Sequence, residues 1–79
     1  MTRDPLPLSD LPVGARARVV ALDAGPELAA RLGALGFRPE TEVRCRRRAP
    51  LGDPRVYELR GTQLCLRRSE ARNIQVEPA

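Results

Sequence analysis

The sequence predicts one small, mostly β domain, a highly curved barrel of about five short strands with one helical insertion. The chain has only 79 residues, which leaves room for one core. Eight prolines and six glycines divide it into short elements joined by turns, which disfavours a helical bundle. Hydrophobic residues make up 42% and charged residues 30%, a globular rather than a disordered composition.

The N-terminal part predicts a tail, a turn and a strand. We expect residues 1–7 to form a disordered N-terminal tail, because two prolines stand among polar residues there, and residues 8–77 to form the domain. Leu8 and Leu11 predict an apolar anchor for the first turn. Residues 16–22 have the β-branched Val19 and Val20 near their middle and predict a strand. Their apolar residues fall on both faces, which indicates a strand covered on both sides.

One helix is predicted over residues 26–35. Pro26 suits the first helical position, where no amide partner is needed, and Gly36 suits the left-handed conformation that closes a helix. The helix carries an apolar stripe at intervals of four and three residues, made by Leu28, Leu32 and Leu35. We expect this stripe to face the barrel.

The second half of the chain predicts β-structure. Residues 42–46 alternate strictly, so Val43 and Cys45 should face the core. A cluster of turn residues at 49–54 leads to a hairpin whose two-residue turn is predicted at Gly61 and Thr62. The predicted opposite pairs are Arg60 with Gln63, Leu59 with Leu64, Glu58 with Cys65 and Tyr57 with Leu66. This register places every large apolar side chain of the hairpin except Val56 on one face.

The last elements are a capped turn and a closing strand. Ser69 is predicted to cap a short turn, and Ile74 and Val76, two residues apart, predict the last short strand. Cys45 faces the core, whereas Cys65 lies on the opposite face of its hairpin. We therefore expect two reduced thiols and no disulfide, as in a cytosolic protein.

The composition excludes several kinds of chemistry. The chain has no His and no Lys, which excludes His-based acid–base catalysis, His metal ligands and a Lys nucleophile. No apolar run approaches the ~18 residues of a membrane span, and the N-terminus lacks a signal core. We expect no enzyme. The net charge of +4 suits nucleic acid, an anionic membrane or an acidic protein patch, and it is equally consistent with solubility alone.

Five blocks, in order, carry a family resemblance that runs from residue 8 to residue 76. They are LSDLPVG at 8–14, RLGALGF at 31–37, APLGDP at 49–54, YELRG at 57–61 and LCLRRSEA at 64–71, followed by Ile74 and Val76. Together they resemble the FeoA family, the small ferrous iron transport protein A domains.

The resemblance implies an SH3-like five-stranded barrel with a helical insertion. It also implies a cytoplasmic accessory protein of ferrous iron uptake, at the inner face of the membrane, that acts with the permease, ferrous iron transport protein B, and its GTP-binding domain. The family is commonly described as binding transition metals. A similar domain occurs at the C-terminus of iron-dependent transcriptional repressors. The chain departs from the family at Glu40, where glycine is usual, so we expect a different local geometry there.

A metal site is one hypothesis. Cys65 beside Glu58 offers one soft and one hard ligand for Fe²⁺ or Zn²⁺, but the sequence places no third donor. Cys45 is expected to be a small core side chain instead. We therefore assign no metal ligand and no cofactor.

Partner binding is the preferred hypothesis, and two surfaces are candidates. The first is the helix edge at Arg31 and Phe37. The second is a stripe made by Arg44, Arg46 and Arg48. The stripe has three interpretations: a solvated face, a site for an acidic patch of the permease or the anionic inner leaflet, or a nucleic-acid site.

The alternative functions are an RNA-binding small barrel and a metal-sensing domain like that of the repressors. RNA binding and polyproline recognition both normally use exposed aromatic side chains, and the chain has one Tyr, one Phe and no Trp.

Overall fold

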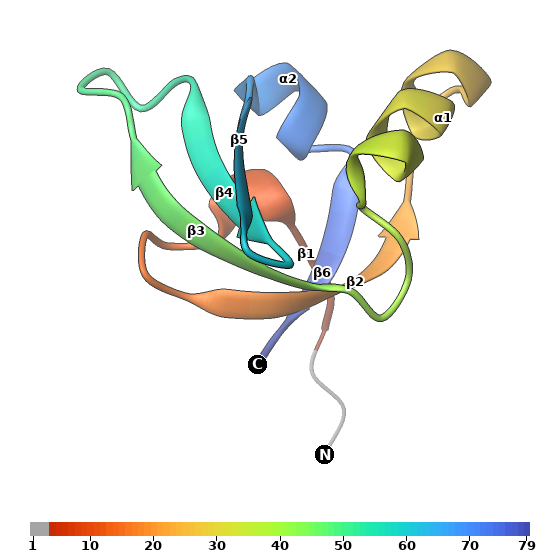
Figure 1. Ribbon diagram of the computed structural model, residues 1–79, viewed down its shortest axis with the longest axis horizontal. Helices are drawn as coiled ribbons and strands as arrows, with labels where there is room; N and C mark the ends of the chain where they lie inside the picture. Colours follow the sequence, from red (N-terminus) through yellow and green to blue (C-terminus); the bar gives the residue numbers. More distant parts are fainter. Residues whose placement is uncertain (1–3) are drawn as a thin grey trace.

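A curved antiparallel sheet of six strands forms the framework of the protein in the computed structural model, which describes residues 4–79 (Figure 1). The strands are β1 (Leu6–Pro7), β2 (Arg16–Leu22), β3 (Glu42–Arg48), β4 (Arg55–Leu59), β5 (Thr62–Leu66) and β6 (Ile74–Pro78). Their order in the sheet is β1-β6-β2-β3-β4-β5. The helices are the short 3-10 helix η1 (Leu8–Asp10), α1 (Pro26–Leu35) and α2 (Arg68–Ala71). The mostly β prediction with one main helical insertion is confirmed.

The start of the chain is more ordered than predicted. Leu6 and Pro7 form β1 and lie opposite Val76 and Gln75 of β6, so the predicted tail is wrong for these two residues. Residues 1–3 lie outside the described residues. The predicted anchor is confirmed, because Leu8 and Leu11 are both buried. Leu8 is the first residue of η1, and Leu11 directly follows this helix. No helix within residues 4–79 has the length and apolar character that crossing a bilayer requires.

A β-bulge, not a two-sided cover, explains the irregular pattern of β2. Val19 lies opposite Val76 of β6, but the next pair is Ala21 with Gln75, so Val20 is an extra residue. A bulge resets the alternation of a strand. Val19 is consequently buried, whereas Ala21 is exposed.

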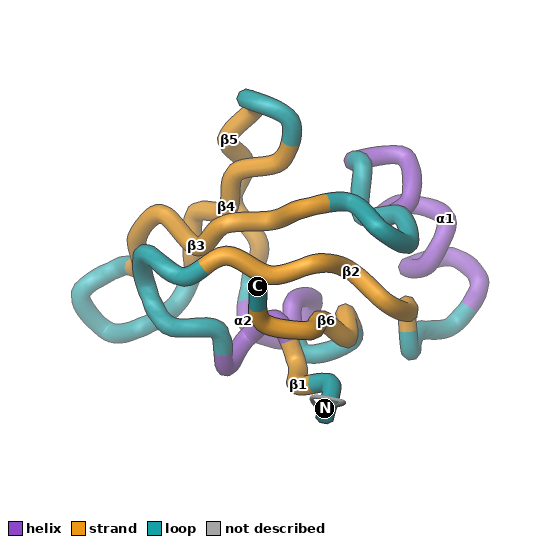
Figure 2. The backbone as a smooth tube through the Cα atoms, turned by 90° about the horizontal axis from the view of Figure 1, so that it is seen from below, coloured by secondary structure: helices purple, strands orange, loops and turns teal. Residues whose placement is uncertain are grey.

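Helix α1 has the predicted bounds, but only the middle of its apolar stripe reaches the core. Gly36 takes a φ of 113°, which ends the helix, and the Phe37 N–H donates to the carbonyl oxygen of Leu32 at 3.0 Å. Leu32 is fully buried and Leu28 half-buried, but Leu35 is 42% exposed. The expectation that the whole stripe faces the barrel is therefore wrong at Leu35. In Figures 1 and 2, α1 lies at one end of the molecule and projects beyond the end of β2.

The β4–β5 hairpin turns one residue earlier than predicted. Arg60 and Gly61 form the turn with φ of 49° and 81°, the type I′ conformation whose twist matches that of paired strands. Tyr57 therefore lies opposite Leu64 rather than Leu66. Because the shift in pairing is two residues, each side chain stays on its predicted face. Cys65 is accordingly exposed, and neither cysteine forms a disulfide.

Helix α2 is capped by Glu70 rather than by Ser69. The Glu70 Oε1 atom accepts a hydrogen bond of 3.0 Å from the Arg67 N–H, while Ser69 lies inside the helix. The prediction of a Ser69 cap is wrong because a longer carboxylate side chain reaches back over the first turn.

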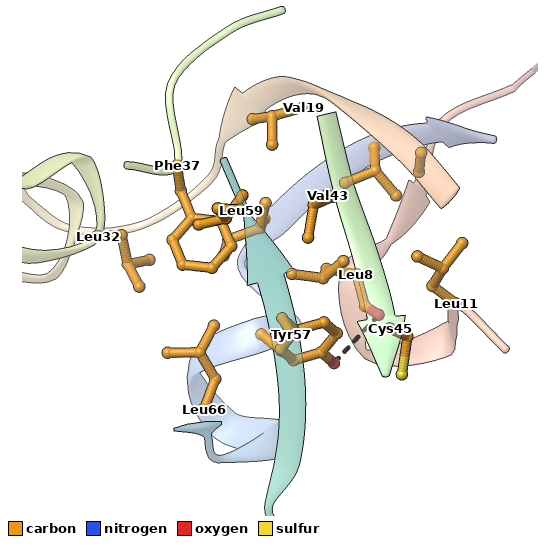
Figure 3. Packing of buried hydrophobic residues seen from close by; sticks show 14 residues of the cluster. Leu8, Leu11, Val19, Leu32, Phe37, Val43, Cys45, Tyr57, Leu59 and Leu66 are labelled. Carbon is orange, nitrogen blue, oxygen red and sulfur yellow. Dashed lines mark hydrogen bonds between the residues drawn. The ribbon is translucent and has the colours of Figure 1, made fainter. Parts of the chain in front are cut away.

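The core lies inside the curve of the sheet and is closed by the residues around η1, α1 and α2 (Figure 3). Tyr57 and Phe37 are its largest side chains. The Tyr57 hydroxyl donates to the Leu8 carbonyl oxygen at 3.4 Å, and Arg55 Nη1 donates to the Leu11 carbonyl oxygen at 2.9 Å. Burial, with a smaller contribution from nearby Cys45, raises the pKa of Tyr57 to about 12. These contacts fix β4 against the N-terminal turn.

Candidate docking surface

The outer surface of β2, β3 and β4 is the candidate site, because it gathers charged side chains around a hollow. Val43 and Cys45 of β3 point into the core, so Arg44 between them points outward. The hollow has a volume of about 440 Å³. We call it the outer hollow, and its charged lining is Arg16, Glu40, Glu42, Arg44, Glu58 and Arg60.

Every carboxylate of the outer hollow has an arginine partner. The pairs are Arg16 Nη1 with Glu42 Oε1 at 3.9 Å, Arg18 Nε with Glu40 Oε2 at 3.5 Å and Arg46 Nε with Glu58 Oε1 at 3.4 Å. Exposed pairs of this kind contribute up to about 1 kcal/mol each. They neutralise the glutamates without strongly stabilising the fold.

Arg44 and Arg60 also line the outer hollow, but neither takes part in these ion pairs. Within residues 4–79, neither of their guanidinium groups has a carboxylate partner. Arg44 lies opposite Arg16 on β2 and opposite Glu58 on β4, but the Glu58 carboxylate is engaged by Arg46. Like charges directly opposite each other on a sheet destabilise it. The hollow thus presents two free guanidinium groups, which suit an anion that accepts paired hydrogen bonds.

The backbone is strained on two sides of the same hollow. Glu40 has a φ of 74° and Arg60 a φ of 49°, a conformation that L-residues with a side chain rarely adopt. The expectation of a different geometry at Glu40 is wrong, because the chain keeps a left-handed turn there without a glycine. The Glu40 N–H donates to the Val19 carbonyl oxygen at 2.8 Å, which holds the turn in place. Strain of this kind is often found at functional sites.

The predicted arginine stripe is not continuous. A second bulge occurs in β3, because Cys45 lies opposite Tyr57 while Arg47, not Arg46, lies opposite Val56. Arg44 lines the outer hollow, Arg46 is the bulge residue, and Arg48 lies opposite Arg55 at the far end of the strand. All three are exposed, as predicted, but the bulge separates Arg48 from the other two.

Of the two residues predicted to form the helix edge, only one lies at the surface. Phe37 is fully buried, so its expected role as an edge contact is wrong. Its side chain fills the core beside Leu59 (Figure 3). Arg31 is exposed, but its Nη1 pairs with Glu70 Oε2 at 2.7 Å and so joins α1 to α2. Arg31 therefore has a structural partner in the fold.

The Cys65 metal hypothesis does not fit the structure. Cys65 lies opposite Val56, and Glu58 lies opposite Gln63, with its carboxylate paired to Arg46. The described part of the chain contains no group of three or more His, Cys, Asp and Glu side chains that could hold a metal ion. A transition-metal site needs about four ligands. No ligand set can be assigned here.

Both aromatic side chains are interior. Phe37 and Tyr57, the only aromatic residues of the sequence, are each fully buried. Neither can stack on a nucleic-acid base or line a polyproline groove. The arrangement therefore favours charge-based contact over these two modes of recognition.

The sequence prediction missed Arg16, Glu40 and Arg60 as lining residues of the hollow. Arg16 meets Arg44 only through the register of β2 with β3, which is a long-range property. Arg60 had a usable local signal, because glycine in the second position of the turn suits a type I′ hairpin. Glu40 also had a local signal, because it stands where the family usually has a glycine.

Comparison with known proteins identifies solved structures that are similar to this chain. None of the curated proteins matches it closely enough to count as a relative. The solved FeoA-like protein of Clostridium acetobutylicum is 31% identical, with a TM-score of 0.88 over 99% of this chain and 90% of that one. The FeoA protein of Chlorobium tepidum is 38% identical, with a TM-score of 0.85 over 92% of this chain and 70% of that one.

A third structure carries a functional description. FeoA of Stenotrophomonas maltophilia, solved in complex with zinc, is 34% identical, with a TM-score of 0.81 over 91% of this chain and 89% of that one. It is described as a prokaryotic SH3 domain protein and a candidate ferrous iron transport activating factor. A manganese-dependent transcriptional repressor, 18% identical with a TM-score of 0.86, shares the fold over 44% of its length. The SH3-like prediction is confirmed. The FeoA domain model matches residues 6–78, and the chain therefore belongs to the FeoA family, which is associated with ferrous iron transport.

Proposed function

We propose that this protein is a non-enzymatic accessory protein of ferrous iron uptake that binds the cytosolic part of the GTP-dependent permease, ferrous iron transport protein B. It works in the cytoplasm, at the inner face of the membrane. Family membership supports the link to iron transport. The description of the S. maltophilia relative as a candidate activating factor supports an accessory role.

The observation that carries the proposal is the unpaired charge of the outer hollow. Arg44 stands opposite Arg16 without a carboxylate of its own among the described residues, and Arg60 is likewise unpaired. Aspartate or glutamate side chains of a partner would relieve the repulsion and accept two hydrogen bonds from each guanidinium group. An acidic patch on the permease is the chemistry that fits.

The residues of the chain support a contact function more than a catalytic one. The sequence holds no His and no Lys. Cys45 and Tyr57 are fully buried, so neither reaches a substrate. The charged groups of the outer hollow lie on an open face rather than in a closed cleft. The proposal assigns no resident metal, because the donor set around Cys65 does not fit one.

Binding to the purified cytosolic domain of the permease tests the proposal. We would measure the dissociation constant by calorimetry, with and without guanine nucleotide, for the unmodified protein and for R44E and R60E. R72E is the matched control, since Arg72 is an exposed arginine directly after α2 that does not line the hollow. Each charge reversal at the hollow should weaken binding about tenfold or more, because it places like charges against the partner.

The control variant should bind within about twofold of the unmodified protein. Far-ultraviolet circular dichroism and the melting temperature would show that each variant is folded. If folded R44E and R60E bind as tightly as the unmodified protein, the outer hollow is not the docking surface. If the unmodified protein does not bind in either nucleotide state, direct contact with the permease is contradicted.

A further inference from the structure

The loop between β3 and β4, residues 49–54, holds the most exposed large apolar side chain of the described residues. Leu51 is 97% exposed, compared with 49% for Val13 and 42% for Leu35. The loop is nevertheless held in shape. The Ala49 N–H donates to the Pro54 carbonyl oxygen at 2.9 Å, and the Gly52 N–H donates to the Ala49 carbonyl oxygen at 2.7 Å. A single exposed leucine is ordinary on any surface, so its surroundings decide its meaning.

The side chains around Leu51 are basic and lack ion-pair partners among the described residues. Arg47 and Arg48 end β3 directly before the loop, and as consecutive strand residues they project from opposite faces of the hairpin. The start of α2 lies against the loop, because the Arg68 N–H donates to Asp53 Oδ1 at 2.9 Å. This contact brings Arg67 and Arg68 close to the loop. Within residues 4–79, none of these four guanidinium groups is paired with a carboxylate.

The position of the loop suits contact with an extended surface. Figure 1 shows the loop and α2 at the same end of the molecule, with the two chain ends at the opposite end. None of the residues of the outer hollow belongs to the loop or to α2. An occupant of the loop would therefore leave the hollow accessible.

The combination of groups matches one kind of surface. An acidic protein patch or a nucleic-acid backbone would pair with the arginines but would leave Leu51 in water. The face of an anionic bilayer offers both parts, since phosphate groups attract arginine and the acyl boundary beneath them accepts an apolar side chain.

We propose that the β3–β4 loop is a membrane-contact site, in which Leu51 enters the boundary of an anionic phospholipid bilayer and Arg47, Arg48, Arg67 and Arg68 bind lipid phosphates. The site is distinct from the outer hollow. The inference goes beyond the proposed function and does not depend on it, because it needs no permease.

Vesicle binding tests the inference. The full chain is centrifuged with vesicles that contain phosphatidylglycerol and with vesicles of phosphatidylcholine alone. We expect binding to the first and none to the second. L51A should weaken binding about tenfold, because most of the apolar contact is lost. R47Q/R48Q should weaken it about twentyfold, because two phosphate contacts are lost. The matched control is L35A, which truncates an exposed leucine on α1 and should change nothing.

A second measurement reports insertion directly. The sequence contains no tryptophan, so L51W places a single reporter at the loop tip. Its emission should shift to the blue with anionic vesicles and stay unchanged with neutral ones. The inference is overturned if L51A and R47Q/R48Q bind anionic vesicles like the unmodified protein, or if the reporter does not shift. It is also overturned if the loop variants lose binding to the permease domain while the unmodified protein ignores vesicles, because the loop would then be a protein contact.

Discussion

The two faces of β3 differ in what determines them. On the inner face, Val43 and Cys45 lie fully buried against Leu59 and Tyr57 of β4. On the outer face, Arg44 and Arg46 are exposed, and only Arg46 has a carboxylate partner within the described chain. The inner face is fixed by close packing, in which every side chain has neighbours. The outer face keeps charge that the fold does not use, and this surplus is what a partner can recognise.

The largest expected effect comes from truncating a large side chain in the core, which the inner face of β3 also contacts. Phe37→Ala removes one of the two largest core side chains and should lower the free energy of unfolding by about 3–5 kcal/mol. The domain as a whole has about that much stability, so the variant should be largely unfolded at room temperature. Urea denaturation followed by circular dichroism would measure the loss.

Two further variants make this result decisive. Phe37→Leu keeps most of the volume and should cost about 1 kcal/mol, which leaves a folded protein to compare. Leu35→Ala truncates an exposed side chain on the same helix and should cost less than about 1 kcal/mol. A loss below about 1 kcal/mol for Phe37→Ala would mean that this residue is not in the core.

The second effect is a pH dependence that belongs to the inner face alone. The pKa of Tyr57 is raised from 10.0 to about 12 by burial and by nearby Cys45. Between these values the phenol ionises in the unfolded chain but stays protonated in the folded protein. The folded state then binds more protons, so the free energy of unfolding should fall as the pH rises from about 10 to about 12, by about 2–3 kcal/mol in total.

Tyr57→Phe isolates this effect. The variant loses the hydrogen bond to Leu8 at every pH, but its stability should decline less than that of the unmodified protein across the same window. All other titratable groups are the same in the two proteins, so their contributions cancel in the comparison. Parallel curves for the two proteins would show that Tyr57 is not the group that titrates.

The contrast between the faces also explains what could be predicted from the sequence. The faces of the strands follow from alternation, so the prediction that Val43 and Cys45 face the core is confirmed. The β4–β5 register was wrong by two residues, but a two-residue shift keeps every side chain on its face. The bounds of α1 were correct because Pro26 and Gly36 mark its ends locally.

Features that depend on distant parts of the chain could not be predicted. The bulges at Val20 and Arg46 are defined only by the partner strand, and the second of them divides the expected arginine stripe. The depth of Phe37 depends on how α1 sits against the sheet, not on the sequence around it. The pair of Arg31 with Glu70 joins residues 39 positions apart, so the sequence around Arg31 cannot show that its guanidinium group has a partner.

The smallest expected effect concerns the strained backbone beside the outer hollow. Glu40 holds a φ of 74°, which costs a residue with a side chain about 1–2 kcal/mol relative to glycine. Glu40→Gly relieves this strain but loses the exposed pair with Arg18 and adds freedom to the unfolded chain. The balance should raise the free energy of unfolding by about 0.5–1 kcal/mol.

Glu40→Ala separates the two contributions, because it removes the carboxylate and keeps the strained Cβ. Its stability should equal that of the unmodified protein or fall by a few tenths of a kcal/mol. Chemical denaturation of the three proteins side by side would measure the differences. A Glu40→Gly variant no more stable than Glu40→Ala would mean that the turn carries no strain. Because the proposed partner is acidic, removal of the Glu40 carboxylate also releases Arg18 from one of its two glutamate partners, so both variants should bind the permease domain at least as tightly as the unmodified protein.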